Sequence, residues 1–159
     1  MTPARRILAA ASALALASAF SGAPAARAEL AKWDQAKVAA LATQLVAATD
    51  ALNDTFYKQP PPSVASMQSR DYYRLKQQVR HLRSEARELS ASLGKNAAFD
   101  ETLPIYEDLM QVVRLARESA QGIFTTQDVI EKATAVRLVL NQLTPYYDAD
   151  AVPLEPVSR

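Results

Sequence analysis

Residues 72–93 constrain the fold of this chain more than any other stretch. Apolar side chains recur in them at alternating intervals of three and four residues over three heptads. These are Tyr72, Leu75, Val79, Leu82, Ala86, Leu89 and Leu93. Because an α-helix turns once in about 3.6 residues, this spacing places all of them on one face. The stretch therefore predicts an amphipathic helix that needs partner helices to bury that face.

Three further segments carry apolar stripes with the same rhythm. Residues 33–57 carry Val38, Leu41, Leu45, Ala48, Leu52 and Phe56; residues 102–121 carry Ile105, Leu109, Val112 and Ala116 beside Tyr106, Met110, Val113 and Ala120; residues 129–143 carry Val129, Ala133, Val136, Leu140 and Leu143. Each segment predicts an amphipathic helix. The double row in residues 102–121 predicts a helix with more than one neighbour.

The residues between the stripes predict where the helices end. Residues 60–62 are all proline, which lacks a backbone N–H and disfavours helix in the residue before it, so they predict an extended connector. We expect Gly94 to close the second helix in the left-handed conformation. We expect Thr125 and Asp128 to start the fourth helix with a capping box, and Phe124 to pack on Val129 beside it.

Four helices of about 20 to 30 residues with mostly short loops predict an all-α fold, an antiparallel up-down-up-down four-helix bundle. The bundle is expected to occupy residues 29–147 as one domain. No alternating apolar pattern bounded by turn residues competes as a β-strand. From Asp148 onward, acids, prolines and few large apolar residues predict a flexible C-terminal tail over residues 148–159.

The first 28 residues have the pattern of a cleavable signal peptide. Arg5 and Arg6 precede an apolar stretch, residues 7–20, and residues 26–28 read Ala-Arg-Ala. The pattern leaves both the general secretory route and the twin-arginine route open. Without Arg5, Arg6 and Arg27, the 18 basic residues fall to 15 against 17 acidic ones, a net charge of −2. We therefore expect an exported protein of the periplasm or thylakoid lumen that does not bind nucleic acid and has no membrane span after cleavage.

Few residues of the chain could carry chemistry. There is no Cys, and His81 is the single histidine. In the heptad frame set by Tyr72, His81 falls on the outer face, where it is a poor ligand for a haem or metal in the core. Two glycines, Gly94 and Gly122, remain after the signal peptide, too few for a phosphate-binding glycine-rich loop. We therefore expect a non-enzymatic protein without a metal or cofactor.

The clearest functional candidate is a basic row along one flank of the apolar stripe in residues 72–93. Its members are Lys76, Arg80, Arg83 and Arg87. Intervals of four, three and four residues place them on one side of the helix. Arginine grips carboxylates through two hydrogen bonds at once, so the row could dock on an acidic partner. The alternative is that the row pairs with acids of a neighbouring helix, such as Glu107, Asp108 or Glu118, or is solvated.

Between about residues 56 and 143 the chain resembles the PsbQ family, the extrinsic four-helix subunits on the lumenal side of photosystem II. The resemblance consists of a proline-rich stretch after residues 56–60, a basic second helix around residues 79–83, a third helix around residues 106–110 and a fourth helix that ends in residues 139–143. It implies a non-catalytic role in stabilising the oxygen-evolving assembly by electrostatic docking, with the basic row as the contact.

These observations favour a non-catalytic bundle that docks on and stabilises a larger, membrane-associated protein assembly through an acidic surface of that assembly. Two alternatives stay open. One is a periplasmic carrier of haem or another small molecule in the bundle core. The other is a periplasmic protein with chaperone-like activity.

Overall fold

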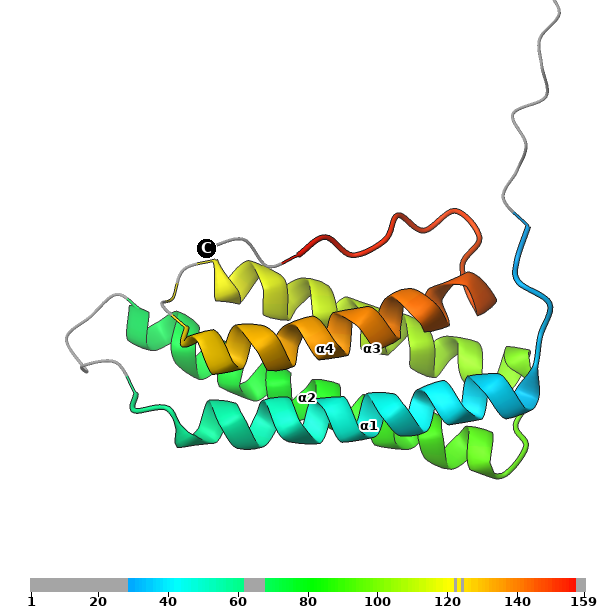
Figure 1. Ribbon diagram of the computed structural model, residues 1–159, viewed down its shortest axis with the longest axis horizontal. Helices are drawn as coiled ribbons and strands as arrows, with labels where there is room; N and C mark the ends of the chain where they lie inside the picture. The colour runs from blue at the N-terminus through cyan, green and yellow to red at the C-terminus, as the bar shows by residue number, and fades with distance from the viewer. Residues whose placement is uncertain (1–28, 62–67, 122, 124, 157–159) are drawn as a thin grey trace, which may run out of the picture.

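The computed structural model describes residues 29–61, 68–121, 123 and 125–156. This part of the chain is helical and contains no strand (Figure 1). Its elements are α1 (Gln35–Lys58), α2 (Gln68–Gly94), α3 (Phe99–Ala120), α4 (Gln127–Leu143) and the 3-10 helix η1 (Thr144–Tyr146). The predicted all-α fold with four helices is confirmed. The predicted signal peptide, residues 1–28, lies outside the described residues.

The helices lie side by side along the long axis of the molecule (Figure 1). α1 packs against both α2 and α4, and α2 packs against α3, whereas the backbones of α3 and α4 approach each other at few points. We call the line along which α3 faces α4 the α3–α4 seam. In the described part of the chain, no helix has the length and apolar character needed to cross a bilayer.

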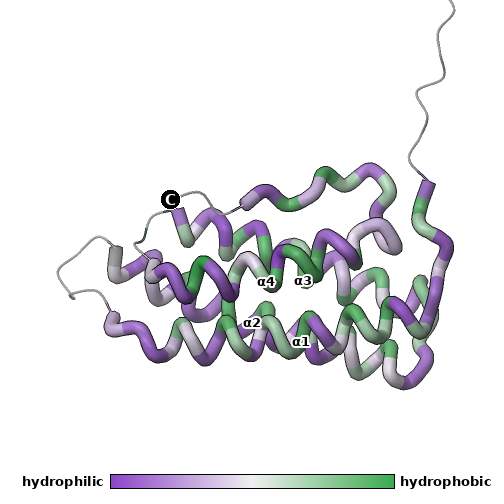
Figure 2. Tube along the Cα trace, in the orientation of Figure 1, coloured by the Kyte–Doolittle hydropathy of each residue, from purple (hydrophilic) through white to green (hydrophobic). Residues whose placement is uncertain are grey.

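The core consists of the stripes that the sequence predicts. All seven stripe residues of α2, from Tyr72 to Leu93, are buried. Leu45 and Phe56 of α1, Leu109 of α3 and Leu140 of α4 are among the most deeply buried side chains around them. Figure 2 shows the pattern behind this burial, in which apolar and hydrophilic residues alternate along the helices. Burial of one face per helix is the main favourable contribution to folding.

The end of α2 differs from the prediction. Gly94 is the last residue of the helix and does not have a positive φ, whereas Asn96 has a φ of 62°. The Ala97 N–H donates to the Ser92 carbonyl at 3.1 Å and the Asn96 N–H donates to the Leu93 carbonyl at 3.0 Å. This is a Schellman motif with Asn96 in the left-handed position. Asparagine tolerates that conformation better than other residues with a side chain, so glycine is not required.

The start of α4 also differs from the prediction. Thr126 is the N-cap residue, and its side chain makes no capping hydrogen bond. The predicted box of Thr125 and Asp128 is therefore wrong, because the helix begins one residue later than that box requires. The Thr126 hydroxyl instead accepts a hydrogen bond from Gln59 Nε2 at the end of α1, at 2.5 Å. The predicted contact of Phe124 lies outside the described residues.

Two tyrosines close one end of the α3–α4 seam. The rings of Tyr106 in α3 and Tyr147 after η1 stack with a centroid distance of 4.3 Å. The Tyr106 hydroxyl donates to Thr144 Oγ1, and the Tyr147 hydroxyl donates to Thr102 Oγ1, both at 3.0 Å. Burial raises the pKa of both phenols. The paired rings and hydroxyls thus join α3 to the end of α4 although the helix backbones stay apart.

The segment after Tyr147 runs back along the bundle (red in Figure 1). We call residues 148–156 the C-terminal strap. Asn141 of α4 accepts a hydrogen bond from the Leu154 N–H at 2.9 Å and donates to the Leu154 carbonyl at 3.3 Å. The Leu154 side chain packs against the core. The sequence predicts a flexible tail here, and its composition does not indicate this contact with α4.

The left-handed backbone conformation of Asn96 leads to a prediction about stability. Asn96→Ala should lower the free energy of unfolding by about 1 kcal/mol, because alanine is strained at a positive φ. Asn96→Gly should leave it unchanged or raise it slightly, because glycine has no such strain. Urea unfolding followed by circular dichroism measures both. Lys95→Ala, at an exposed neighbour, is the control, and equal losses for Asn96→Ala and Asn96→Gly would contradict the motif.

Candidate functional site

The predicted basic row lies on the side of α2 that faces α1, and the structure divides it into two pairs. Arg83 and Arg87 contact Asp50 in the middle of α1. Lys76 and Arg80 contact Tyr57 near the end of α1. The two pairs differ in charge balance, because one pair contacts an acid and the other contacts an aromatic ring.

Arg83 and Arg87 are held by an acid within the protein. Arg83 Nε lies 2.5 Å from Asp50 Oδ1, and Arg87 Nη2 lies 3.0 and 3.1 Å from the two Asp50 carboxylate oxygens. Burial by itself would raise the pKa of Asp50, but hydrogen bonds from Arg83 and Arg87 outweigh it and hold the pKa below its ordinary value. This cluster ties α1 to α2 and leaves less positive charge for an external acid.

Lys76 and Arg80 have an aromatic partner instead. Lys76 Nζ lies 4.2 Å from the centroid of the Tyr57 ring, and the Arg80 guanidinium carbon lies 5.9 Å from it. Arg80 Nη2 also donates a hydrogen bond to the Tyr57 hydroxyl. Neither cation makes an ion pair with a carboxylate of the described residues. Their charge is therefore not neutralised by a neighbouring acid.

The surroundings of Lys76 and Arg80 are aromatic and exposed. Tyr57 is 39% exposed and Tyr73 is 53% exposed, high values for large aromatic side chains. Tyr73, Lys76 and Arg80 follow one another at intervals of three and four residues on one face of α2. We call Tyr57, Tyr73, Lys76 and Arg80 the Tyr57 patch. It combines two positive charges with two exposed rings.

Sequence reasoning missed Asp50 as the acid of this region. It proposed Glu107, Asp108 or Glu118, all of which belong to α3, whereas the ion pairs form with α1. The only local signal is that Asp50 is an acid one position after the buried Thr49. Whether Asp50 meets an arginine depends on how α1 and α2 are aligned along their length. The spacing of residues within one helix does not predict that alignment.

Several other aromatic residues pack in the core, and the histidine lies at the surface. Tyr72, Tyr146 and Tyr147 are buried in the core, and Trp33 packs edge-on against Tyr147 at 5.5 Å between ring centroids. His81 is exposed, as its heptad position predicts. Among the described residues, no three His, Cys, Asp or Glu side chains are grouped so as to hold a metal ion.

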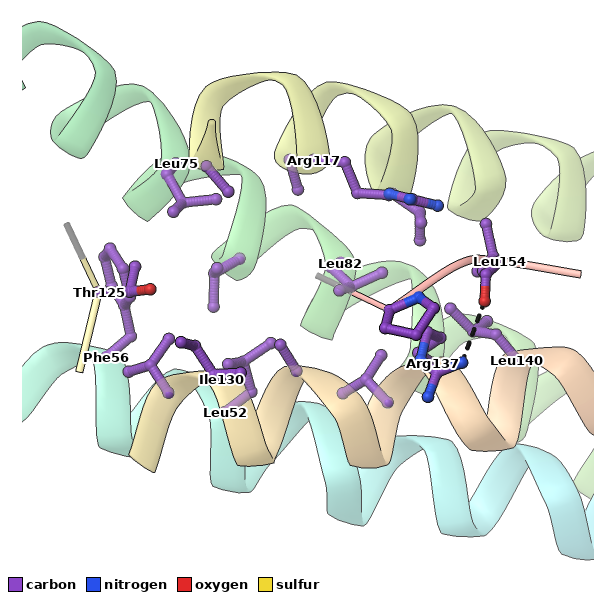
Figure 3. Close-up of a pocket in the computed structure, with 18 of the residues that line it drawn as sticks. Leu52, Phe56, Leu75, Leu82, Arg117, Thr125, Ile130, Arg137, Leu140 and Leu154 are labelled. Carbon is purple, nitrogen blue, oxygen red and sulfur yellow. Dashed lines mark hydrogen bonds between the residues drawn. The ribbon is translucent and has the colours of Figure 1, made fainter. Parts of the chain in front are cut away.

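A second candidate site lies where the α3–α4 seam does not close. A cavity of about 160 Å³ opens between the second half of α3 and the part of α4 from Val129 to Leu140 (Figure 3). Its apolar walls come from all four helices. They include Leu52, Phe56, Leu75, Val79, Leu82, Val113, Ala116, Ala120, Val129, Ile130, Ala133, Val136 and Leu140. The strap covers part of the cavity with residues 154–156.

Two arginines border this cavity. Arg117 approaches it from α3 and Arg137 from α4, with the strap at Leu154 between them (Figure 3). Arg137 Nη1 donates to the Leu154 carbonyl at 3.1 Å, while Arg137 Nε is buried and has no hydrogen-bond partner. Sequence reasoning did not single out either arginine. The available signal was weak, because Arg137 simply follows the stripe residue Val136.

Comparisons with known proteins found no match to this chain. No protein-family model matches the chain, and neither the curated proteins nor the solved structures contain a match. The candidate sites therefore rest on their own geometry.

The Asp50 cluster predicts a pH-dependent stability. Asp50→Asn should lower the free energy of unfolding by about 1 kcal/mol near neutral pH, because it removes the shared acceptor of two arginines. Since the pKa of Asp50 is lowered in the folded state, its contribution is present above the ordinary aspartate pKa and is lost as the pH falls through the folded-state value. Urea unfolding of both proteins at about pH 7 and about pH 2 measures this difference.

Asp108→Asn is the matched control, because Asp108 is exposed and makes no ion pair with another described residue. It should change the free energy of unfolding by less than about 0.5 kcal/mol at either pH. A gap between wild type and Asp50→Asn that stays constant down to acid pH would contradict the role of the Asp50 carboxylate.

Proposed function

We propose that the protein is a non-catalytic, exported four-helix bundle that docks on an acidic surface of a larger protein assembly through the Tyr57 patch. The observation that carries this proposal is that Lys76 and Arg80 share the exposed Tyr57 ring and make no ion pair with any described acid. Of the four residues in the predicted basic row, Lys76 and Arg80 are the two whose positive charges are available to a carboxylate of a partner. Arg83 and Arg87 are assigned instead to the link between α1 and α2.

The patch suits a protein partner for two physical reasons. A ring held against two cations keeps their side chains extended, so less rotamer entropy is lost when a carboxylate binds. Tyrosine and arginine are also the residues that most often supply large shares of binding energy at protein interfaces. Such a contact gains from charge attraction during encounter and from ring burial once docked.

The proposal includes an antiparallel up-down-up-down order of the four helices. Contacts between helix ends support it. Gln35 at the start of α1 donates to the Leu93 carbonyl near the end of α2, at 3.1 Å. Gln59 at the end of α1 bonds Thr126 at the start of α4, and Tyr106 near the start of α3 bonds Thr144 after α4. Neighbouring helices in this order would run in opposite directions.

The resemblance to the PsbQ family suggests a specific assembly. On this proposal, the acidic surface belongs to the lumenal side of photosystem II, and the protein is an extrinsic subunit there. The support is the segment pattern over about residues 56 to 143, which contains Tyr57, Lys76 and Arg80. Export through a signal peptide over residues 1–28 fits the same proposal.

Rebinding to stripped membranes tests the docking. Membranes from the organism that encodes the chain are washed with concentrated salt to release extrinsic proteins, and the purified protein is added back at low salt. The double variant Lys76→Glu, Arg80→Glu should rebind at least about tenfold more weakly, because it replaces two attractions with two repulsions. Sedimentation of the membranes measures the bound fraction.

Arg114→Glu, Lys132→Glu is the matched control, since both residues are exposed on α3 and α4 and the charge change is the same. This control should rebind as the wild type does, and chemical crosslinking of the bound wild type should identify a partner with an acidic contact surface. Equal loss of rebinding in both double variants would show that net charge alone causes the loss, which contradicts a specific contact. Unchanged rebinding of Lys76→Glu, Arg80→Glu would show that the Tyr57 patch does not dock.

A further inference from the structure

We propose that the cavity in the α3–α4 seam binds a small amphipathic carboxylate, with its apolar body inside the cavity and its carboxylate on Arg137 and Arg117. The observations behind this inference are separate from those behind the docking function. They concern the interior cavity, the arginines of α3 and α4 that border it and the strap, whereas the Tyr57 patch lies on the surface of α1 and α2.

The size and walls of the cavity specify the apolar body. Its volume of about 160 Å³ is close to that of an engineered apolar protein cavity of about 150 Å³ that binds benzene. Aliphatic side chains such as Val113, Val129 and Ala133 form the walls. Cavities with such walls favour apolar ligands over water, because water finds no hydrogen-bond partners there. One aromatic ring or a short aliphatic chain therefore fits.

The arginines specify the charged end. Arg137 Nε is a buried donor without an acceptor, which is unfavourable for a group that is always charged. A carboxylate placed on the Nε edge of the guanidinium would satisfy Nε and a terminal nitrogen at once. Arg117 borders the same cavity and makes no ion pair with the described residues, so it adds a second positive charge. Glu155 lies in the wall but pairs with neither arginine.

The strap lies in the cavity wall beside the charged end of the proposed site. The Leu154 carbonyl accepts from Arg137 Nη1, so it competes with a ligand carboxylate for the charge of this guanidinium, while the Leu154 side chain packs on the core. Asn141 holds this part of the strap through both hydrogen bonds to Leu154 but is not part of the cavity wall. A ligand carboxylate on Arg137 therefore competes with the strap carbonyl, and weakening the attachment of the strap should favour the ligand.

A matched pair of fluorinated probes tests the inference. 4-(Trifluoromethyl)benzoate carries a ring and a carboxylate, and 4-(trifluoromethyl)benzyl alcohol carries the same ring without the charge. Fluorine NMR titration of the full protein gives the Kd of each. The benzoate should bind at least about tenfold more tightly than the alcohol, because hydrogen bonds to charged groups are stronger than those to neutral ones.

Two variants locate the effect. Arg137→Gln should remove the preference for the benzoate and leave the Kd of the alcohol within about twofold, while the exposed control Arg114→Gln should keep the preference. Asn141→Ala should bind the benzoate several-fold more tightly than the wild type, because the strap then competes less. Circular dichroism checks that each variant keeps its helices.

Three results would overturn the inference. One is equal affinity of the wild type for benzoate and alcohol, or binding of neither probe. Another is a benzoate preference that survives in Arg137→Gln. The third is weaker binding by folded Asn141→Ala, which would make the strap part of the site and not its competitor.

Discussion

The apolar faces of α3 and α4 have to be buried although the two helix backbones meet at few points. At one end of their seam, the stacked rings of Tyr106 and Tyr147 fill the space and their hydroxyls bond Thr144 and Thr102. At the other end a cavity bordered by all four helices remains beside the C-terminal strap. The seam thus has a closed half and an open half, and both candidate sites occupy the end of the bundle with the open half.

The two sites use positive charge in different ways. The positive charges of Arg83 and Arg87 are paired within the protein with the carboxylate of Asp50, and these ion pairs link α2 to α1. Lys76 and Arg80 make no ion pair with a described acid and lie beside the exposed Tyr57 ring. Arg137 has one buried donor without a hydrogen-bond partner at the edge of an apolar cavity. Charge balance, and not the number of basic residues, separates these roles.

The sequence was enough to predict the four helices, because the stripes from Val38 to Leu143 repeat at a spacing that a single helix determines locally. It was not enough for contacts that depend on how helices align. Asp50 meets Arg83 only in one register of α1 against α2, and Leu154 meets Asn141 only when the strap folds back. The left-handed Asn96 was missed because glycine is the commoner residue at that position.

Native-state hydrogen exchange measured by NMR tests the uneven seam most directly. Residues 105–110 of α3 include Tyr106, which stacks on Tyr147, and residues 112–117 include Val113, Ala116 and Arg117, which line the cavity. Both sets lie inside the same helix. The structure predicts that residues 112–117 exchange at least about tenfold faster, because fewer contacts hold that half against local opening. Equal protection of the two sets, or greater protection beside the cavity, would contradict a seam that is closed at one end and open at the other.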